Sequence, residues 1–167
     1  MNPTPFVKWP GGKRQLMPQI MPLIPERFET YIEPFVGGGA TLFALASAGR
    51  LSGAVIGDRN EELVTTYRAI RSNPDAVSWA LSRHAKRHSK RYYYAIRDMQ
   101  PAGDVAIAAR MIYLNKAGFN GLYRVNGKGK FNVPFGQKKS VGVPGLEALR
   151  TCSEALREVE VECWDFG

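Results

Sequence analysis

A glycine-rich segment and an acidic residue downstream of it could together bind a nucleotide-like cofactor. Residues 33–40 read Glu-Pro-Phe-Val-Gly-Gly-Gly-Ala and separate a predicted strand from a predicted helix. Glycines at such a junction let a ligand approach the backbone closely. Asp58 ends the next apolar stretch, where a carboxylate can accept hydrogen bonds from both hydroxyls of a ribose. The two features predict a ligand that contains a ribose.

The spacing of the glycines disfavours ligands that are held by their phosphates. The dinucleotide pattern G-x-G-x-x-G fails at its third glycine, which is Leu42. The phosphate-binding P-loop pattern also fails, since Arg14 follows Gly12-Lys13 and Val7 occupies the place of its first glycine. A cofactor with a ribose but no phosphate fits better, and S-adenosylmethionine is the common one. A nicotinamide cofactor is the weaker alternative.

Each of these features also has a purely structural explanation. The glycine run could serve a tight turn and no ligand. Asp58 could cap the helix that begins just after it, because an aspartate is a favoured N-cap residue.

Positive charge is concentrated in a segment that contains no acidic residue, between Asp104 and Glu147. Aromatic, asparagine and glycine residues interleave with its cations, which is typical of a surface that grips phosphates and contacts bases. The alternative is a solvated, irregular insertion. The whole chain carries a formal charge of +8, and seven cations lie in this segment: Arg110, Lys116, Arg124, Lys128, Lys130, Lys138 and Lys139.

A second basic set has the spacing of one helical face. It either follows a phosphate backbone or forms a solvated helix surface. Its members are Arg83, Lys86, Arg87, Lys90 and Arg91.

The order strand, glycines, helix, strand and acid is the beginning of a doubly wound α/β sheet. We predict strands over 30–36, 53–57 and 159–164, and helices over 14–23, 40–48, 61–72, 75–85, 92–99, 105–116 and 146–158. Residues 117–143 have the pattern of a hairpin with loops. We divide the chain into a first part of the cofactor domain at 1–58, an insertion at 59–145 and a return to the cofactor domain at 146–167.

Composition excludes several classes of protein. Of the 167 residues, 44% are hydrophobic and 11% aromatic, so the chain is not disordered throughout. Two cysteines are too few for a disulfide scaffold, and no His/Cys cluster has zinc spacing. No apolar run approaches the roughly 20 residues of a membrane span. We expect a cytoplasmic protein without metal or membrane contact.

Five motifs occur in the order found in the Dam-type DNA adenine-N6 methyltransferases, and the chain resembles that family. Residues 6–13 resemble its K-W-x-G-G-K motif, and residues 33–39 resemble its E-P-F-x-G-x-G cofactor loop. Residues 113–124 and 129–136 are similar to its target-recognition hairpin, and Asp165-Phe166 to its D-F pair. Any one motif could arise by chance, whereas the ordered set is specific.

The resemblance implies a Rossmann-like sheet that binds S-adenosylmethionine, with an inserted helical and β-hairpin region that recognises DNA. The implied reaction is methyl transfer from S-adenosylmethionine to N6 of adenine in a short duplex site. The implied cofactor residues are Trp9 and Lys13 over the methionine part, Phe35, Gly37 and Gly39 in the loop, Asp58 at the ribose, and Asp165 and Phe166 beside the adenine.

The resemblance also implies which residues contact double-stranded DNA. Arg and Asn can make bidentate hydrogen bonds to guanine and adenine edges, and an aromatic tip can wedge between bases. Plainer roles remain open: Trp9 in the core, Phe119 in hairpin packing and Asn120 as a left-handed turn residue. The implied DNA-binding residues are Lys116, Phe119, Asn120, Gly121, Arg124, Lys128, Lys130, Asn132 and Lys138.

One motif of the family is absent. Transfer to adenine N6 uses D-P-P-Y, and no two of the 11 prolines are adjacent, so we assign no catalytic residue. We expect the N-terminal portion of a longer enzyme, ending before D-P-P-Y and leaving an incomplete sheet of about three strands. Such a portion would pair with a C-terminal portion, and a restriction enzyme is a further candidate partner. The alternative is a non-catalytic, DNA-binding remnant of such an enzyme.

Overall fold

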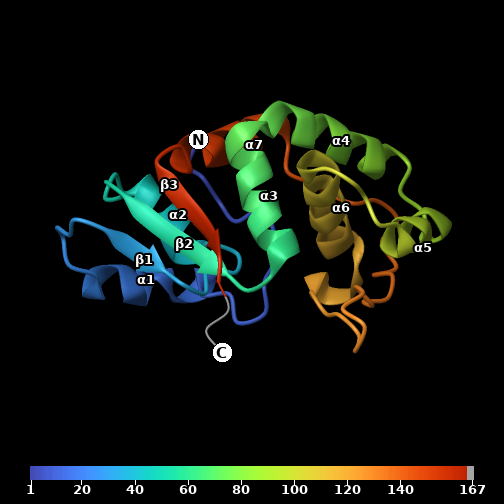
Figure 1. The fold of residues 1–167 in the computed structure, drawn as a ribbon, viewed down its shortest axis with the longest axis horizontal. Coiled ribbons are helices and arrows are strands. Elements are labelled where there is room, and N and C mark those ends of the chain that lie inside the picture. The colour runs from blue at the N-terminus through green and yellow to red at the C-terminus, as the bar shows by residue number, and fades with distance from the viewer. Residues whose placement is uncertain (165–167) are drawn as a thin grey trace.

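A three-stranded parallel sheet forms one half of the molecule (Figure 1). The computed structural model describes residues 1–164, so Asp165 and Phe166 lie outside the described residues. The strand order is β1-β2-β3, with β1 at Tyr31–Glu33, β2 at Ala54–Asp58 and β3 at Val159–Cys163. This mixed α/β architecture is consistent with a methyltransferase fold, as the sequence predicts.

The register brings the acidic ends of β1 and β2 to one edge of the sheet. Glu33 pairs with Ile56, two residues before the end of β2 at Asp58. Because parallel strands share one direction, the loops that follow them emerge side by side, where ligands bind in α/β sheets. The sequence therefore places the glycine loop and Asp58 at the same edge.

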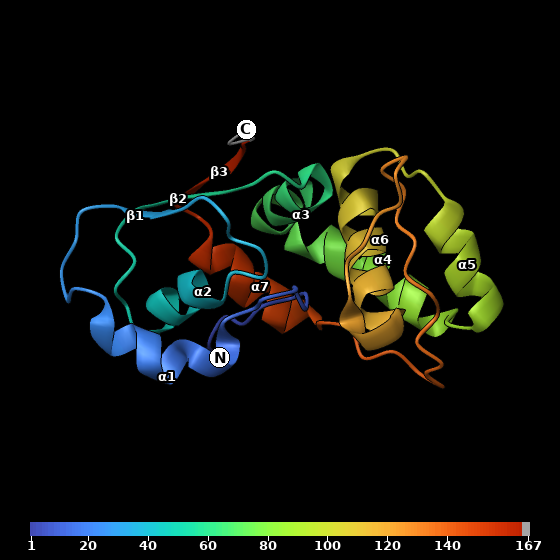
Figure 2. The ribbon, with the colours of Figure 1, turned by 90° about the horizontal axis from the view of Figure 1, so that it is seen from below.

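Helices cover the sheet on one face and along one edge. Figure 2 shows α2 (Ala40–Ser47) and α7 (Leu146–Ala155) on the same side of the strands. Helix α3 (Glu61–Ser72) follows the outer edge of β3, where two arginine side chains donate to backbone carbonyls: Arg68 to Val161 at 3.0 Å and Arg71 to Val159 at 2.6 Å. On the other edge strand, Ile32 is 62% exposed.

The other half of the molecule is helical and is centred on α6 (Asp104–Ala117). Figure 1 shows α3, α4 (Pro74–Lys86) and α5 (Lys90–Asp98) around it. Most α6 residues from Ala108 to Ala117 are buried, and the helix lies where the sequence predicts one, over 105–116. Within the described residues no helix is long and apolar enough to cross a membrane.

Residues 118–136 form an irregular hairpin that regular strand pairing does not hold. Two isolated antiparallel bridges join it, Gly118 with Phe135 and Val125 with Phe131. The short helix η3 (Phe119–Gly121) follows α6. At the tip, the side chain of Asn126 accepts from the amides of Lys128 and Lys130, and Gly129 takes the positive φ of +72°. The hairpin predicted within 117–143 is thus present, and its turn closes at Gly129.

Three helix predictions need correction. The segment 14–23 is broken into η1 (Arg14–Leu16), α1 (Met17–Ile20) and η2 (Met21–Leu23), because Pro18 and Pro22 lack amide donors. The last helix ends at Ala155, three residues earlier than predicted. The five cations from Arg83 to Arg91 do not share one helix, because α4 ends at Lys86 and Ser89 caps the start of α5.

Two glycines with positive φ allow a matched test of the cofactor loop. A Cβ on Gly39 would lie 2.5 Å from the Tyr67 hydroxyl, whereas a Cβ on Gly49 would meet nothing within 4 Å. Gly49→Ala should cost about 1–2 kcal/mol of backbone strain, and Gly39→Ala about 1–3 kcal/mol more from overpacking. Urea unfolding of both variants measures the difference. Equal losses would show that the loop yields to the added methyl group.

Candidate functional site

One cavity of about 1330 Å³ brings together segments that are distant in the sequence. It lies among residues 5–15, the loop after β1, the junction of β2 with α3, and the base of the hairpin at 120–125. The predicted residues in its lining are Trp9, Lys13, Phe35, Gly37, Asp58, Lys116, Asn120, Gly121 and Arg124. The predicted residues outside the lining are Gly39, Phe119, Lys128, Lys130, Asn132 and Lys138.

The carboxylate of Asp58 fixes the glycine loop. The Gly37 amide donates to Asp58 Oδ2 at 3.2 Å, and the Asn60 amide donates to Asp58 Oδ1 at 3.0 Å. The N-cap of α3 is Asn60, whose side chain accepts from the Leu63 amide at 3.0 Å, so the capping alternative for Asp58 is wrong. Asp58 lines the cavity, and its oxygens retain lone pairs for further donors.

The two glycines assigned to the cofactor have different surroundings. Gly37 has φ +49° and faces Trp9, since a Cβ there would lie 2.6 Å from the indole Cδ1. Gly39 has φ +72° and faces the core at Tyr67 and Phe43. The structural explanation of a tight turn therefore fits Gly39. Of these two glycines, Gly37 is the one that lines the cavity.

Trp9 is half-buried between the glycine loop and the hairpin. Its ring stacks on Tyr123, with centroids 4.9 Å apart and planes inclined by 27°. It packs against the core, as its plainer role requires, and it also lines the cavity, so its role at the cofactor stays a prediction. This stack links the N-terminal segment to the hairpin.

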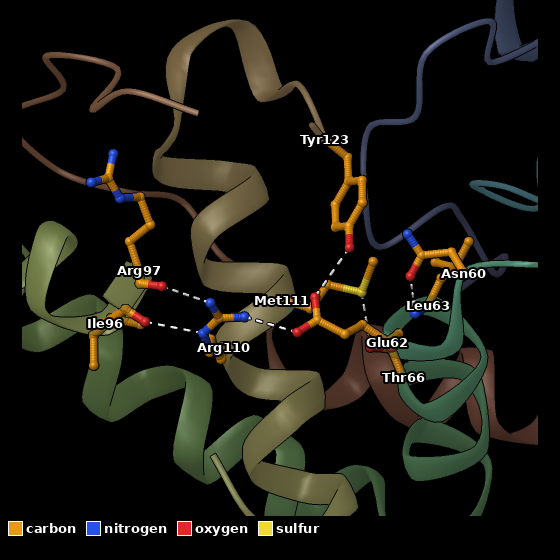
Figure 3. Close-up of polar contacts among 9 residues, drawn as sticks. All are labelled: Asn60, Glu62, Leu63, Thr66, Ile96, Arg97, Arg110, Met111 and Tyr123. Carbon is orange, nitrogen blue, oxygen red and sulfur yellow. Dashed lines mark hydrogen bonds and ion pairs between the residues drawn. The ribbon is translucent and has the colours of Figure 1, made fainter. Parts of the chain in front are cut away.

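The tyrosine of this stack is hydrogen-bonded to Glu62, which in turn pairs with the buried Arg110 (Figure 3). The Tyr123 hydroxyl donates to Glu62 Oε2 at 3.2 Å, and Arg110 donates to Glu62 Oε1 at 3.0 Å. Arg110 also donates to the carbonyls of Ile96 and Arg97 at the end of α5. Burial, with Glu62 close by, raises the pKa of Tyr123 to about 12, so its hydroxyl keeps its proton at neutral pH.

The inclusion of Arg110 among the cations of a DNA-facing surface is wrong. Its side chain is buried and paired with Glu62. Its position inside an apolar helix was the available signal, because an arginine there must find an acidic or carbonyl partner.

Asn115 joins the N-terminal segment to the hairpin. Its Oδ1 accepts from the Lys8 amide at 2.8 Å, and its Nδ2 donates to the Lys8 carbonyl at 2.8 Å and to the Gly121 carbonyl at 2.9 Å. The residue is 1% exposed. No role was predicted for it, although a lone amide inside the apolar helix expected over 105–116 signals a structural hydrogen-bond network.

Glu33 opens the glycine-rich segment and lines the cavity, although no role was predicted for it from the sequence. Its Oε2 is buried without a hydrogen-bond partner among the described residues. Burial raises the pKa of its carboxyl group. An acceptor in this state suits a ligand that brings a hydrogen-bond donor or a positive charge.

Three residues assigned to DNA lie in the first half of the hairpin and differ in their surroundings. Asn120 has φ +53°, so the left-handed turn alternative is confirmed for it. Phe119 is 51% exposed, so the alternative of hairpin packing is not supported. Arg124 donates to Asn132 Oδ1 at 2.8 Å across the hairpin.

The lysines assigned to DNA lie at the two ends of the hairpin. Lys128 and Lys130 are exposed at its tip. At the other end, Lys138 Nζ donates to the Lys116 carbonyl. Burial lowers the pKa of Lys116, and the positive charges of Lys8 and Lys138 lower it further. Within residues 1–164 no group of three or more His, Cys, Asp or Glu side chains is placed to hold a metal.

Two asparagines test how far the site depends on Asn115. Asn115→Ala leaves buried amide and carbonyl groups without partners and should cost about 2–5 kcal/mol of unfolding free energy. Asn126→Ala loses two hydrogen bonds from the amides of Lys128 and Lys130. Because both residues are exposed, this change should cost about 1 kcal/mol or less. Urea unfolding compares the two variants, and a loss at Asn115 no greater than that at Asn126 would contradict this role.

Known proteins match almost the whole chain. A type II methyltransferase of Lactococcus lactis subsp. cremoris, M1.LlaDCHI, is 41% identical over 99% of this chain and 60% of its own length. The type II methyltransferase M.MjaIII of Methanocaldococcus jannaschii is 37% identical over 99% of this chain and 63% of its own length. A DNA adenine methylase of Haemophilus influenzae is 34% identical over 97% of this chain and 57% of its own length.

The chain thus spans about three fifths of the length of the curated relatives that it matches. The family model of the D12 class N6 adenine-specific DNA methyltransferases matches residues 9–167. This match begins at Trp9 of the cavity and includes the glycine loop, Asp58 and the hairpin. The chain belongs to the D12 class of N6-adenine-specific DNA methyltransferases.

Proposed function

We propose that the chain supplies the S-adenosylmethionine site and the DNA-recognition region of a site-specific adenine-N6 methyltransferase. The observation that carries this proposal is that one cavity is lined both by the cofactor motifs and by the base of the hairpin. A methyl group can pass directly from donor to base only if both ligands reach one space. The names of the relatives, type II methyltransferases and DNA adenine methylases, support the choice of substrate.

The donor set of the cavity fits S-adenosylmethionine. This cofactor brings two ribose hydroxyls, an ammonium group and a sulfonium centre, and the cavity offers the carboxylates of Asp58 and Glu33. When bound, it would supply an electrophilic methyl group. We assign the ribose to Asp58, the cover of the methionine part to Trp9 and Lys13, and the loop wall to Phe35 and Gly37.

The hairpin supplies groups suited to duplex DNA. Arg124 lines the cavity and can make a bidentate contact to guanine once it leaves Asn132. The exposed ring of Phe119 can wedge between bases and ease extrusion of the target base. Lys116, Lys128, Lys130 and Lys138 would hold phosphates.

The names of the relatives support a setting for the proposed activity. Because two of them are named type II methyltransferases, we propose a restriction enzyme of the same specificity as a partner. We place the protein in the cytoplasm, where such enzymes meet DNA.

The alternative is a DNA-binding remnant without transfer, since D-P-P-Y is absent from the 167 residues. Labelled S-adenosylmethionine, supplied together with a C-terminal portion that carries D-P-P-Y, separates the two, because the remnant would still bind DNA and transfer nothing.

Substitution of the acid at the ribose position tests the cofactor assignment. Asp58→Asn keeps the shape of the side chain but loses charge-assisted acceptance, so the affinity for S-adenosylmethionine should fall about 10–100-fold. Asp75→Asn, an exposed acid on α4, should leave it unchanged. Calorimetry measures both. Tight binding of a nicotinamide dinucleotide without binding of S-adenosylmethionine would overturn the assignment.

Two basic residues should affect DNA binding differently. Arg124→Ala should reduce the preference for the recognition site by about 5–150-fold, which corresponds to 1–3 kcal/mol. Lys138→Ala should weaken binding to all sequences alike and lower the salt slope by about one. Fluorescence anisotropy with specific and scrambled duplexes measures both effects. Equal loss on every sequence for both variants would contradict base readout by Arg124.

A further inference from the structure

A basic corner lies where α4 meets α5, outside the cavity. We define the α4–α5 corner as Arg83, Lys86, Arg87, Lys90 and Arg91, which are all exposed. Arg83 and Lys86 are in the last turn of α4, and Lys90 and Arg91 begin α5 after the Ser89 cap. The break between the helices thus gathers cations from two helix ends around one turn.

The loop that follows the hairpin is attached to this corner. His88, inside the turn, places its Nε2 3.1 Å from the Lys138 carbonyl, and its ring lies 5.5 Å from that of Phe135. Its other nitrogen, Nδ1, lies 3.0 Å from the Tyr113 hydroxyl of α6. Lys138 and Lys139 are exposed beside the corner and extend it.

Among residues 1–164, no acidic side chain forms an ion pair with these charges. The sequence has no Asp or Glu between Asp75 and Asp98, or between Asp104 and Glu147. In the described part of the chain, the ion pairs of arginine lie elsewhere, at Arg68, Arg97, Arg110, Arg150 and Arg157. Like charges that lack counterparts repel one another, so an anionic partner would stabilise the corner.

The corner is continuous with the proposed DNA site. Lys116 lines the cavity, and its carbonyl accepts from Lys138 Nζ. A positive track therefore runs from the cavity through Lys116 and Lys138 to the corner. A duplex carries about one negative charge per 1.7 Å of its axis, so a track of this kind matches its backbone.

We propose that the α4–α5 corner binds the phosphate backbone of duplex DNA outside the recognition site. This proposal rests on the proposed function, because it extends the same DNA site. The corner adds affinity that depends on salt and on duplex length, and it leaves the choice of sequence to the hairpin.

Two triple variants with equal loss of charge test the corner. The first is Lys86→Gln, Arg87→Gln and Lys90→Gln. The control is Arg27→Gln, Arg150→Gln and Arg157→Gln, which removes three exposed cations that belong neither to the corner nor to the hairpin. Anisotropy titrations over a salt series use duplexes of about one and about two helical turns that contain the recognition site, and scrambled duplexes of the same lengths.

The first variant should bind the longer duplex about 10–100-fold more weakly at low salt, with a salt slope smaller by about two to three. Its ratio of specific to scrambled affinity should stay unchanged, and the gain in affinity with duplex length that we expect of the original chain should disappear. The control should keep all three properties.

Equal slopes for the two triple variants would overturn the corner while leaving the hairpin site in place. A changed ratio of specific to scrambled affinity in the first variant would also overturn it, because the corner would then take part in base readout. If the original chain bound no duplex at all, the proposed function itself would fall together with the corner.

Discussion

The hydrogen bonds of Asn115 join the N-terminal segment to the hairpin, the two parts that we propose bind ligands. The N-terminal segment carries Trp9 and Lys13, while the hairpin carries Asn120 and Arg124, and these parts meet only through tertiary contacts. Asn115 holds the backbone of Lys8 on one side and the carbonyl of Gly121 on the other. Because this amide is buried, its three bonds have no competition from water and are costly to lose. The shape of the cavity depends on this junction.

A second connection runs beside the first. The Trp9–Tyr123 stack closes one wall of the cavity, and Glu62 holds the tyrosine hydroxyl. Glu62 is in turn held by Arg110, which also binds the carbonyls at the end of α5. The cavity wall is therefore tied to the helical half by an ion pair that starts four residues after Asp58. Cofactor loop, hairpin and helices share one set of polar contacts.

Much of the fold and of the site follows from local sequence rules. The helices at 61–72 and 105–116 and the strand at 53–57 lie close to their predicted positions, because apolar periodicity and caps specify them. The glycine loop and Asp58 meet as predicted, because parallel strands end at one edge. The motif residues at 9–13 and 120–124 reach the same cavity, although their sequence separation exceeds 100 residues. The sequence predicted that they belong to one site only through the resemblance of the ordered motifs to a family, because spacing alone does not show that they meet.

What could not be predicted depends on partners distant in sequence. The composition of its segment suggested that Arg110 lies on the surface. In the structure it is buried, because Glu62 is placed to form an ion pair with it. Asn115 lies in a correctly predicted helix, but only the positions of Lys8 and Gly121 reveal the partners of its buried amide. Likewise, the five cations near residue 87 have helical spacing, yet Ser89 caps a new helix and divides them.

The central claim is that cofactor and DNA-facing segments share one cavity. Hydrogen–deuterium exchange with and without S-adenosylmethionine tests it most directly, since it reports on each segment separately. The account predicts slower exchange both at residues 9–13 and 35–39 and in the hairpin at 120–125 when the cofactor is bound. Protection of the glycine loop with unchanged exchange in the N-terminal segment and the hairpin would contradict a shared cavity.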